Sequence, residues 1–348
     1  MSKQKAVLIL GVFVDVKSEK QNIRTAEDRI AAMFQRNNIA VITSSSAGSR
    51  IKRFVHNVYT IISKRKAYHV AIVPLFGTTP AFILQEMITR LLNVFSKKIV
   101  LGIHGGSIQE RIDKGANRFY TAMKRADILY APSDYFSSYF KEKGYKVEVI
   151  ENPIELSVYK FCPKKIIRPR ILWMRAFSDI YNPLMAVRVA KRLAEKYNDF
   201  EMVMAGKEGP LSNAVKSMSK EMGLSNKISF PGYINMQQKQ TFAETYDIYI
   251  CTNKIDNTPV SLTEFMQLGL PVVSVNIGGI PYMIKDGING LLVNDDDDEA
   301  MFNKIDLLIS NNFLAQSIVT NAYNYVQQYD EVNVIKKWNI VLNKFSTV

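Results

Sequence analysis

The chain of 348 residues contains few of the residue types that build disulfide frameworks and metal centres: two cysteines and three histidines. Cys162 and Cys251 lie far apart and lack the short spacing of a metal-binding pair, so we expect reduced thiols in a cytosolic protein. His56, His69 and His104 are too few and too scattered to suggest a metal centre built from histidines.

Long apolar runs are also missing. No segment approaches the ~20 apolar residues that are needed to cross a bilayer. The stretch Met1–Val14 has the order of a signal peptide, but its apolar part is short, Asp15 follows at once, and no small-residue cleavage site is present. Ala6–Val14 is better interpreted as the buried first strand of a parallel sheet.

The composition that remains is that of a folded, enzyme-like chain, with 47% hydrophobic and 22% charged residues, and its length suits two domains. The net charge of +13 is unevenly distributed. Residues 1–165 carry 27 Lys and Arg against 13 Asp and Glu, whereas residues 166–348 carry 18 against 19. This asymmetry indicates an anionic partner for the first half: a membrane surface, a nucleic acid or a phosphorylated substrate.

Strand and helix signals alternate through both halves, which predicts an α/β fold with two doubly wound parallel sheets. In the first half we expect strands at 6–14, 39–44, 69–74, 98–104, 128–131 and 147–150, with helices at 25–37, 50–66, 80–95 and one ending near residue 125. In the second half we expect strands at 170–174, 200–205, 228–230, 246–252, 270–275 and 291–293, with helices at 183–197, 211–222, 259–268 and two near the end. The basic, proline-bracketed stretch 161–169 is the expected linker.

The most informative segment runs from Asp256 to Pro281, directly after an apolar strand. Thr258 is placed to cap a helix whose first residue is Pro259, and Gly269 is placed to end it. A helix N-terminus behind a strand end is where an open α/β sheet holds phosphate. Carboxylates at 256 and 264 flank those amides. Amides for a diphosphate and carboxylates for sugar hydroxyls are the chemistry of a nucleotide-sugar site.

This segment resembles the signature of the retaining family 4 glycosyltransferases (glycosyl transferases group 1), in which two Glu residues with seven between them bind the donor. The resemblance implies the GT-B fold, with two Rossmann-like domains facing a central cleft. It implies an acceptor-binding domain at 1–165, a nucleotide-sugar-binding domain at 166–330 and a helix at 331–348 that crosses back to the first domain. Asp256 would face the transferred sugar, one methylene shorter than the usual Glu, and Glu264 would face the ribose.

The resemblance also suggests how the donor diphosphate is held. Arg175 follows a strand end at the place of the family's diphosphate arginine, and its fixed guanidinium fork suits phosphate oxygens. The lysine that the family adds nearby is missing here. Lys207, beside a glycine step at Gly206, either substitutes for it or is simply solvated. Tyr233 lies in a turn like the one that contacts the base, and His104 follows a strand near the expected position of the reacting sugar. The helix start completes the expected donor site with Asn257, Thr258, Pro259, Val260 and Ser261.

These features predict a glycosyltransferase that moves a sugar from a nucleotide-sugar, expected to be a UDP-sugar, to a glycan or lipid-linked acceptor with retention. Arg175 would stabilise the leaving diphosphate. The acidic run 295–299 is interpreted as a solvated loop and helix start. No Asp-x-Asp-type metal motif is evident elsewhere, so we expect no metal and no cofactor. An epimerase or hydrolase of sugar nucleotides is an alternative. A basic nucleic-acid-binding protein is another, but clustered aromatics in a basic groove are missing, and we expect no nucleic acid as partner.

The segment Arg50–Lys66 combines apolar residues at helical spacing with basic residues on its other faces and at its end. We expect the apolar stripe to pack into the core; it consists of Ile51, Phe54, Val55, Val58, Ile61 and Ile62. The basic residues suggest a hypothesis about location. Each contributes about 1 kcal/mol near an anionic leaflet, so the first domain would dock peripherally on the inner face of the cell membrane.

Overall fold

The structure is a computed structural model that describes residues 5–11, 13, 25–45, 49–75, 79–104, 108–113, 115 and 118–345. The chain forms two compact units. The first comprises Met1–Glu155 with Gln328–Val348, and the second comprises Leu156–Gln327. The first boundary therefore falls earlier than the expected 165/166. The basic stretch 161–169 lies in the second unit because it bonds there: the backbone N–H of Cys162, for example, donates to the Leu268 carbonyl at 3.0 Å.

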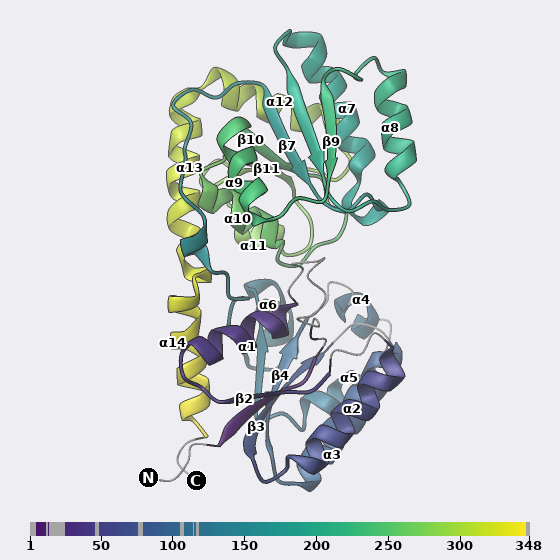
Figure 1. The fold of residues 1–348 in the computed structure, drawn as a ribbon, viewed down its shortest axis with the longest axis vertical. Helices are drawn as coiled ribbons and strands as arrows, with labels where there is room; N and C mark the ends of the chain where they lie inside the picture. Colours follow the sequence, from purple (N-terminus) through teal and green to yellow (C-terminus); the bar gives the residue numbers. More distant parts are fainter. Residues whose placement is uncertain are drawn as a thin grey trace. The chain divides into compact units, whose positions relative to one another are not determined.

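The first unit contains, within its described residues, a six-stranded parallel sheet in the order β2-β1-β3-β4-β5-β6 (Figure 1). Its strands are β1 (Ala6–Ile9), β2 (Val41–Thr43), β3 (Tyr68–Leu75), β4 (Lys98–Ile103), β5 (Ile128–Ala131) and β6 (Val147–Val149). Its helices are α1 (Ala26–Arg36), α2 (Arg50–Ser63), α3 (Thr79–Val94), α4 (Ile108–Asp113), α5 (Arg118–Met123), α6 (Asp134–Glu142) and α14 (Glu331–Asn343). The single helix expected near residue 125 is thus two helices, and α6 was not expected.

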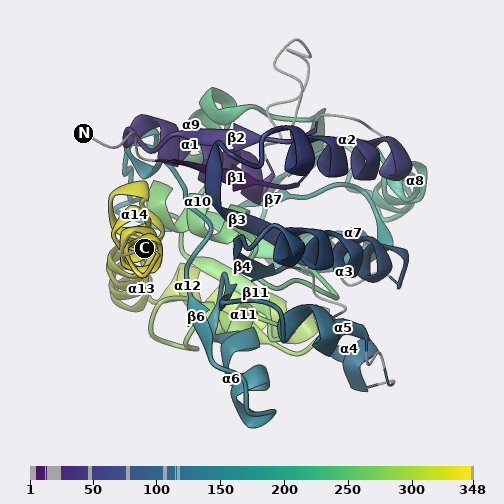
Figure 2. The same cartoon turned by 90° about the horizontal axis from the view of Figure 1, so that it is seen from below.

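Alternation along the buried strands gives the first sheet a hydrophobic core on each face. Leu8 joins the core that contains residues of α2, α3, α5 and α6, whereas its neighbour Ile9 joins the core that contains residues of α1 and α14. Trp338 of α14 packs edge-on against Phe34 of α1 and against Tyr130 of β5, with ring centroids 5.4 Å and 4.8 Å apart. The last helix of the chain is therefore part of the first unit's core (Figure 2).

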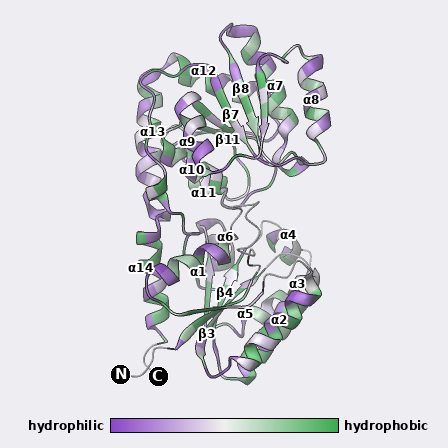
Figure 3. Cartoon of the chain, viewed as in Figure 1, coloured by the Kyte–Doolittle hydropathy of each residue, from purple (hydrophilic) through white to green (hydrophobic). Residues whose placement is uncertain are grey.

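Helix α2 differs from the expectation for its apolar stripe. Ile61 is buried, but Ile51 is 75% exposed, Val55 is 56% exposed and Ile62 is 41% exposed. The expectation that the whole stripe packs into the core was wrong, because only one side of the helix faces the sheet. Figure 3 shows hydrophobic and hydrophilic residues alternating along α2.

The second unit is also built on a six-stranded parallel sheet within its described residues, in the order β12-β11-β10-β7-β8-β9. Its strands are β7 (Arg170–Met174), β8 (Glu201–Ala205), β9 (Ile228–Gly232), β10 (Ile248–Cys251), β11 (Val272–Val275) and β12 (Leu291–Val293). Its helices are α7 (Pro183–Lys196), α8 (Ser212–Glu221), α9 (Met236–Thr245), α10 (Val260–Leu268), α11 (Ile280–Met283), α12 (Asp298–Ser310) and α13 (Asn312–Val326). Helix α7 packs against α8 and α12, and α10 packs against α9 and α13.

Strands β7 and β10 are neighbours in the middle of this sheet, with Ile171 beside Ile248 and Trp173 beside Ile250. Segments that leave their carboxyl ends must therefore start side by side. The described part of the chain has no helix long and apolar enough to cross a membrane.

Candidate functional site

The candidate site of the second unit begins where β7 and β10 end. Arg175 follows β7 directly, and Asn253 and Asp256 lie in the loop after β10. The Arg175 guanidinium donates from Nη2 to Asp256 Oδ2 at 3.4 Å and from Nε to Asn253 Oδ1 at 3.3 Å. It also lies over the Tyr181 ring, 5.5 Å from the centroid. Neighbouring strand ends thus bring together the arginine and the first carboxylate that the sequence singled out.

The Asp256 carboxylate is bound by donors of its own loop. Its Oδ2 accepts from Asn253 Nδ2 at 2.7 Å, and the backbone N–H groups of Asn257 and Thr258 also bond to the carboxylate. Burial raises the pKa of Asp256, although Arg175 and these hydrogen bonds act in the opposite direction. Because several donors hold it, this carboxylate fixes both the loop and the position of Arg175.

Helix α10 starts one residue later than expected. Pro259 is the N-cap, with ψ of 109°, and no side chain caps the helix. The expectation that Thr258 caps a helix starting at Pro259 was wrong, because the extended ψ of Pro259 keeps it outside the helix. Within the described residues Thr258 Oγ1 is buried without a hydrogen-bond partner. The first turn, which includes Val260 and Ser261, therefore presents backbone N–H groups that no side chain caps.

The interior of α10 is fixed by aromatic neighbours. Ser261 Oγ lies 2.8 Å from the Tyr249 hydroxyl, and the Tyr249 ring stacks on Phe265 with centroids 4.3 Å apart. Tyr249 belongs to β10, so the helix is attached to the strand that precedes it. The Ser261 hydroxyl is used for this attachment, which leaves its backbone amide as the group available at the helix start.

Glu264 is buried, with 4% of its surface exposed, and its two carboxylate oxygens are already paired. Oε1 accepts from the Tyr159 hydroxyl at 2.8 Å, and Oε2 accepts from Lys239 Nζ at 2.7 Å. We did not foresee Tyr159 or Lys239. They lie 105 and 25 positions away in the sequence, and no local pattern connects either of them with Glu264.

The glycine step after β8 is set by close backbone contact. Gly206 has φ of +154°, and a Cβ there would lie 1.7 Å from the Arg175 carbonyl oxygen. Lys207, next in sequence, is exposed. Tyr233 is 43% exposed, and its pKa is raised by burial and by the negative charge of Glu264. Gly206 therefore lets the backbone after β8 approach that of Arg175.

The Gly-Gly-Ile-Pro turn packs on the loop of Asp256. The Gly279 N–H donates to the Asp256 carbonyl at 3.0 Å. A Cβ at Gly278 would lie 2.2 Å from the Asp256 carbonyl oxygen, and one at Gly279 would lie 1.9 Å from the Asn257 carbonyl oxygen. These two glycines are required because backbone lies against backbone, which fixes the loop ahead of α10.

His104 belongs to the first unit, at the end of β4. It is buried, and its Nε2 lies 3.0 Å from the Tyr130 hydroxyl. Burial lowers the pKa of His104 to about 4, so the imidazole is neutral at physiological pH. Glu27 lies near Tyr130, and burial raises the pKa of both. The glycines that follow His104 in the sequence lie outside the described residues.

The described ranges of the chain contain no group of three or more His, Cys, Asp or Glu arranged to hold a metal ion. Cys162 and Cys251 are free thiols.

Two parallel-sheet units of this kind define the GT-B fold, and solved structures share it. The crystal structure of Anabaena Alr3699/HepE in complex with UDP and glucose superposes with a TM-score of 0.72 at 16% identity, covering 98% of this chain and 100% of that chain. The crystal structure of TarM gives a TM-score of 0.66 at 19% identity, covering 85% of this chain and 58% of that chain.

The match to a known family lies within the second unit. Residues 164–325 match the family model of glycosyl transferases group 1. The putative colanic acid biosynthesis glycosyltransferase WcaL of Salmonella typhimurium is 22% identical over 258 residues, which is 69% of this chain and 62% of the relative. The poly(ribitol-phosphate) alpha-N-acetylglucosaminyltransferase of Staphylococcus aureus is 26% identical over 165 residues, 47% of this chain and 32% of the relative. The matches thus span less than two thirds of these relatives.

Proposed function

We propose that this protein transfers a sugar from a UDP-sugar to a glycan or lipid-linked precursor of the cell envelope, with retention of anomeric configuration. The observation that carries this proposal is the convergence of Arg175, Asp256 and the uncapped start of α10 at one edge of the second sheet. The arginine and the backbone amides suit the two phosphates of a nucleoside diphosphate. The carboxylates suit the hydroxyls of the sugar that it bears.

The diphosphate would lie against the start of α10. Its oxygens would accept from the backbone N–H groups of the first turn and from the Thr258 hydroxyl, which is buried and has no partner among the described residues. Arg175 would pair with the same oxygens, and Lys207 would supply a second cation from the surface. These donors are held in place by the fold, so they stabilise the charge that develops as the diphosphate leaves.

The nucleoside and the sugar would be held by the two carboxylates. Glu264 would accept from the ribose hydroxyls while Lys239 and Tyr159 keep its oxygens oriented. Tyr233 would contact the base. Asp256 would face the transferred sugar, although it is shorter than the family's glutamate and several donors already bond to it. Its main contribution in this proposal is therefore to hold Arg175 toward the diphosphate.

The acceptor would bind to the first unit. His104 is neutral, so it can hydrogen-bond a sugar hydroxyl without placing a charge beside it. Similarity to WcaL and to the poly(ribitol-phosphate) transferase favours an envelope glycan as acceptor. We also propose that the basic first unit docks on an anionic membrane surface through α2.

The test is a transfer assay with a panel of UDP-sugars and an extracted pool of lipid-linked acceptors, with products identified by mass spectrometry. We expect a product that needs both donor and acceptor and forms in excess EDTA. Turnover of the sugar nucleotide without any acceptor would instead indicate an epimerase or hydrolase. Complete loss of transfer in EDTA, restored by magnesium or manganese, would contradict the metal-independent mechanism.

A further inference from the structure

A second group of charged residues lies at the opposite edge of the second sheet. Arg170 starts β7 and Asp247 immediately precedes β10, so both sit at the amino ends of neighbouring strands. Arg175 and Asn253, which belong to the candidate donor site, follow the carboxyl ends of the same two strands. A strand rises about 3.3 Å per residue, so the two groups are separated by roughly 15 Å along β7.

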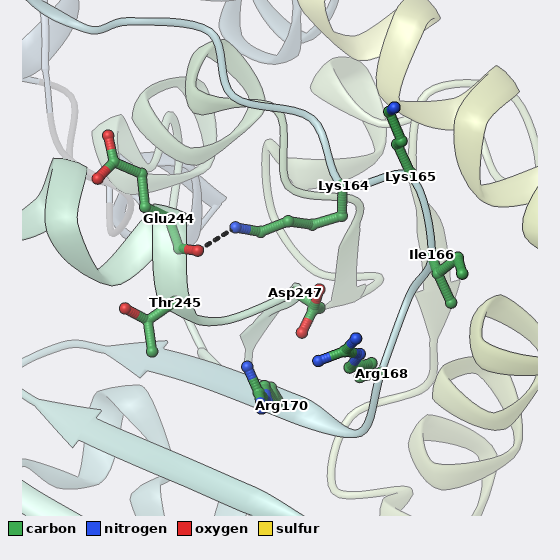
Figure 4. Close-up of a pocket in the computed structure, with 8 residues that line it drawn as sticks. All are labelled: Lys164, Lys165, Ile166, Arg168, Arg170, Glu244, Thr245 and Asp247. Atoms are coloured by element: carbon green, nitrogen blue, oxygen red, sulfur yellow. Dashed lines mark hydrogen bonds between the residues drawn. The ribbon is translucent and has the colours of Figure 1, made fainter.

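This group lines a hollow of about 290 Å³, shown in Figure 4 and called the basic hollow below. It is lined by Lys164, Lys165, Ile166, Arg168, Arg170, Glu244, Thr245 and Asp247. Cationic side chains outnumber acidic ones, so the basic hollow favours an anion. Its volume is at the lower end of the range for ligand sites, which suits a small polar group.

The basic hollow also contains a buried carboxylate, that of Asp247. Only 4% of this residue is exposed, and its Oδ2 is buried without a hydrogen-bond partner among the described residues. Burial raises the pKa of Asp247 to about 6. The positive charges of Lys164, Arg170 and Arg168 lower this pKa, but by less than burial raises it. A buried acceptor without a donor is costly, so its presence here calls for a donor from outside the chain.

The cations around Asp247 are also available. Lys164 Nζ donates to the Glu244 carbonyl oxygen, as Figure 4 shows. By contrast, the side chains of Lys165, Arg168 and Arg170 form no hydrogen bond or ion pair with any described residue. The ends of Arg168 and Arg170 lie on the same side of the basic hollow as the Asp247 carboxylate (Figure 4). Two guanidinium forks and one free carboxylate oxygen therefore border the same space.

We propose that the basic hollow binds a phosphate ester of a sugar or polyol. The phosphate would pair with the guanidinium groups of Arg168 and Arg170, whose planar forks match phosphate oxygens. A hydroxyl of the same ligand would donate to Asp247 Oδ2. A bare anion would be repelled by that carboxylate, and a neutral sugar would leave the cations unpaired. Only a ligand with both groups satisfies both sets of residues.

The carbon skeleton of such a ligand would lie near Ile166, which is 67% exposed at the rim of the basic hollow. The ligand could be a free phosphate ester or one unit of a phosphate-linked glycan chain, since both present the same groups. This site is separate from the proposed donor site and does not depend on the donor's identity.

The test is a calorimetric titration of glycerol 3-phosphate, inorganic phosphate and glycerol into the full chain. The chain carries Arg175→Gln, so that phosphate binding at the other edge of the sheet is weakened. We expect glycerol 3-phosphate to bind more tightly than either of the other two. The double variant Arg168→Gln/Arg170→Gln should lose at least tenfold in affinity. Lys220→Gln, which removes an exposed cation on α8, should leave the affinity unchanged.

Asp247→Asn gives the sharper result because the two ligands should respond in opposite directions. Affinity for glycerol 3-phosphate should fall severalfold as the carboxylate acceptor is lost, while affinity for inorganic phosphate should rise as the repulsion is removed. If Asp247→Asn strengthens both ligands, the basic hollow is a plain anion patch and the proposal is wrong. Unchanged affinity in the double arginine variant would also overturn it.

A conservative variant and a competition experiment complete the test. Arg168→Lys keeps the charge but removes the guanidinium fork, so it should weaken binding of glycerol 3-phosphate. It serves as the test if the double variant fails to fold, and full retention of affinity would count against the proposal. A glycerol phosphate polymer that competes at lower phosphate concentration than glycerol 3-phosphate would identify a glycan chain as the ligand. If the polymer and glycerol 3-phosphate compete at equal phosphate concentration, the ligand is a single phosphate ester.

Discussion

At the scale of single residues, the acidic side chains of the candidate donor site are paired within the chain itself. Glu264 bonds to Lys239 and Tyr159, and Asp256 bonds to Arg175 and Asn253. Such pairing keeps a buried carboxylate oriented, so that it is already in place for a ligand hydroxyl. It also means that each carboxylate has a structural role that experiments must separate from its role in binding.

For Glu264 we expect Glu264→Ala to lower UDP affinity by one to two decades, because a hydrogen bond from a ligand to a charged group contributes about 1.5–3 kcal/mol. Calorimetric titration of UDP checks this. An unchanged dissociation constant in a folded variant would remove Glu264 from the site.

The contribution of Glu264 to the stability of the fold can be measured by changing its partner, Lys239. Lys239→Met leaves the buried carboxylate without its cation and should destabilise the fold by about 3 kcal/mol in urea unfolding. Glu264→Gln/Lys239→Met removes both charges and should recover part of that loss. If the double variant is no more stable than Lys239→Met, the two residues are not coupled as the structure indicates.

Arg175 should matter more for turnover than for binding, because its charge is needed most as the diphosphate leaves. We expect Arg175→Ala to lower kcat while KM for the donor changes little, and Arg175→Lys to restore only part of the rate because it lacks the fork. Steady-state kinetics with varied donor concentration measure both constants. A higher KM with unaltered kcat would point to uniform binding instead.

Asp247 should make stability depend on pH. Its pKa rises from 3.8 in the unfolded chain to about 6 in the fold, so the folded protein holds this proton more tightly. The contribution of Asp247 to the stability of the fold is therefore most favourable below pH 4 and is lost as pH rises through 6. We expect Asp247→Asn to be more stable than the parent by about 2 kcal/mol at pH 7.5 and by much less at pH 4.5. Urea unfolding at both values checks this, and a constant difference would contradict it.

At the scale of elements, the candidate donor site depends on one helix start and the turn that supports it. Gly278 and Gly279 lie against the backbone of Asp256 and Asn257, so the loop ahead of α10 has a single position. The uncapped first turn of α10 is then presented in a fixed orientation. This backbone packing and the hydrogen bond from the Gly279 N–H to the Asp256 carbonyl support a helix start that has no side-chain cap.

We expect Gly279→Ala to displace this loop, since its Cβ would lie 1.9 Å from the Asn257 carbonyl oxygen. UDP affinity should fall at least tenfold. Gly223→Ala is the control, because its Cβ would meet nothing within 4 Å and only its φ of +74° opposes the change. That variant should lose about 1 kcal/mol of stability and keep its UDP affinity. Equal effects of both variants on UDP binding would show that the turn does not position the site.

At the scale of the whole molecule, the basic charge of the first 165 residues coincides with an exposed apolar surface in the same unit. Ile51, Val55 and Tyr59 are exposed on α2. Lys52 is exposed on the same helix, and Arg65 is exposed in the turn that follows it. Apolar side chains flanked by cations match a surface of anionic lipid headgroups over acyl chains. The exposure of the stripe, which the sequence did not predict, strengthens the membrane hypothesis.

We expect the protein to co-sediment with anionic liposomes and not with neutral ones, and to dissociate at high salt. Ile51→Ser/Val55→Ser should weaken this binding by removing inserted apolar area. Val332→Ser, an exposed apolar residue on α14, is the control and should have no effect. Binding that ignores lipid charge, or no binding at low salt, would favour a soluble acceptor.

The sequence by itself determined much of the local structure. The strands at 128–131, 170–174 and 291–293 were predicted residue for residue, because buried parallel strands are short apolar runs between clear breaks. Arg175, Asp256 and Glu264 could be named because strand end, turn and helix start are contiguous in sequence. Helices α6, α9 and α11 were missed: α6 and α11 are short, and α9 is polar with a weak periodic signal.

Only the tertiary structure decided which side chains pair across the fold. The bonds from Tyr159 and Lys239 to Glu264 join residues from three segments, and hydrogen bonds of this kind leave no periodicity in the sequence. The same applies to the exposure of the stripe on α2 and to the basic hollow around Asp247. A local pattern shows that a residue is apolar or charged. Which neighbours cover it depends on how distant strands are ordered in the sheet, and that ordering is a property of the folded chain alone.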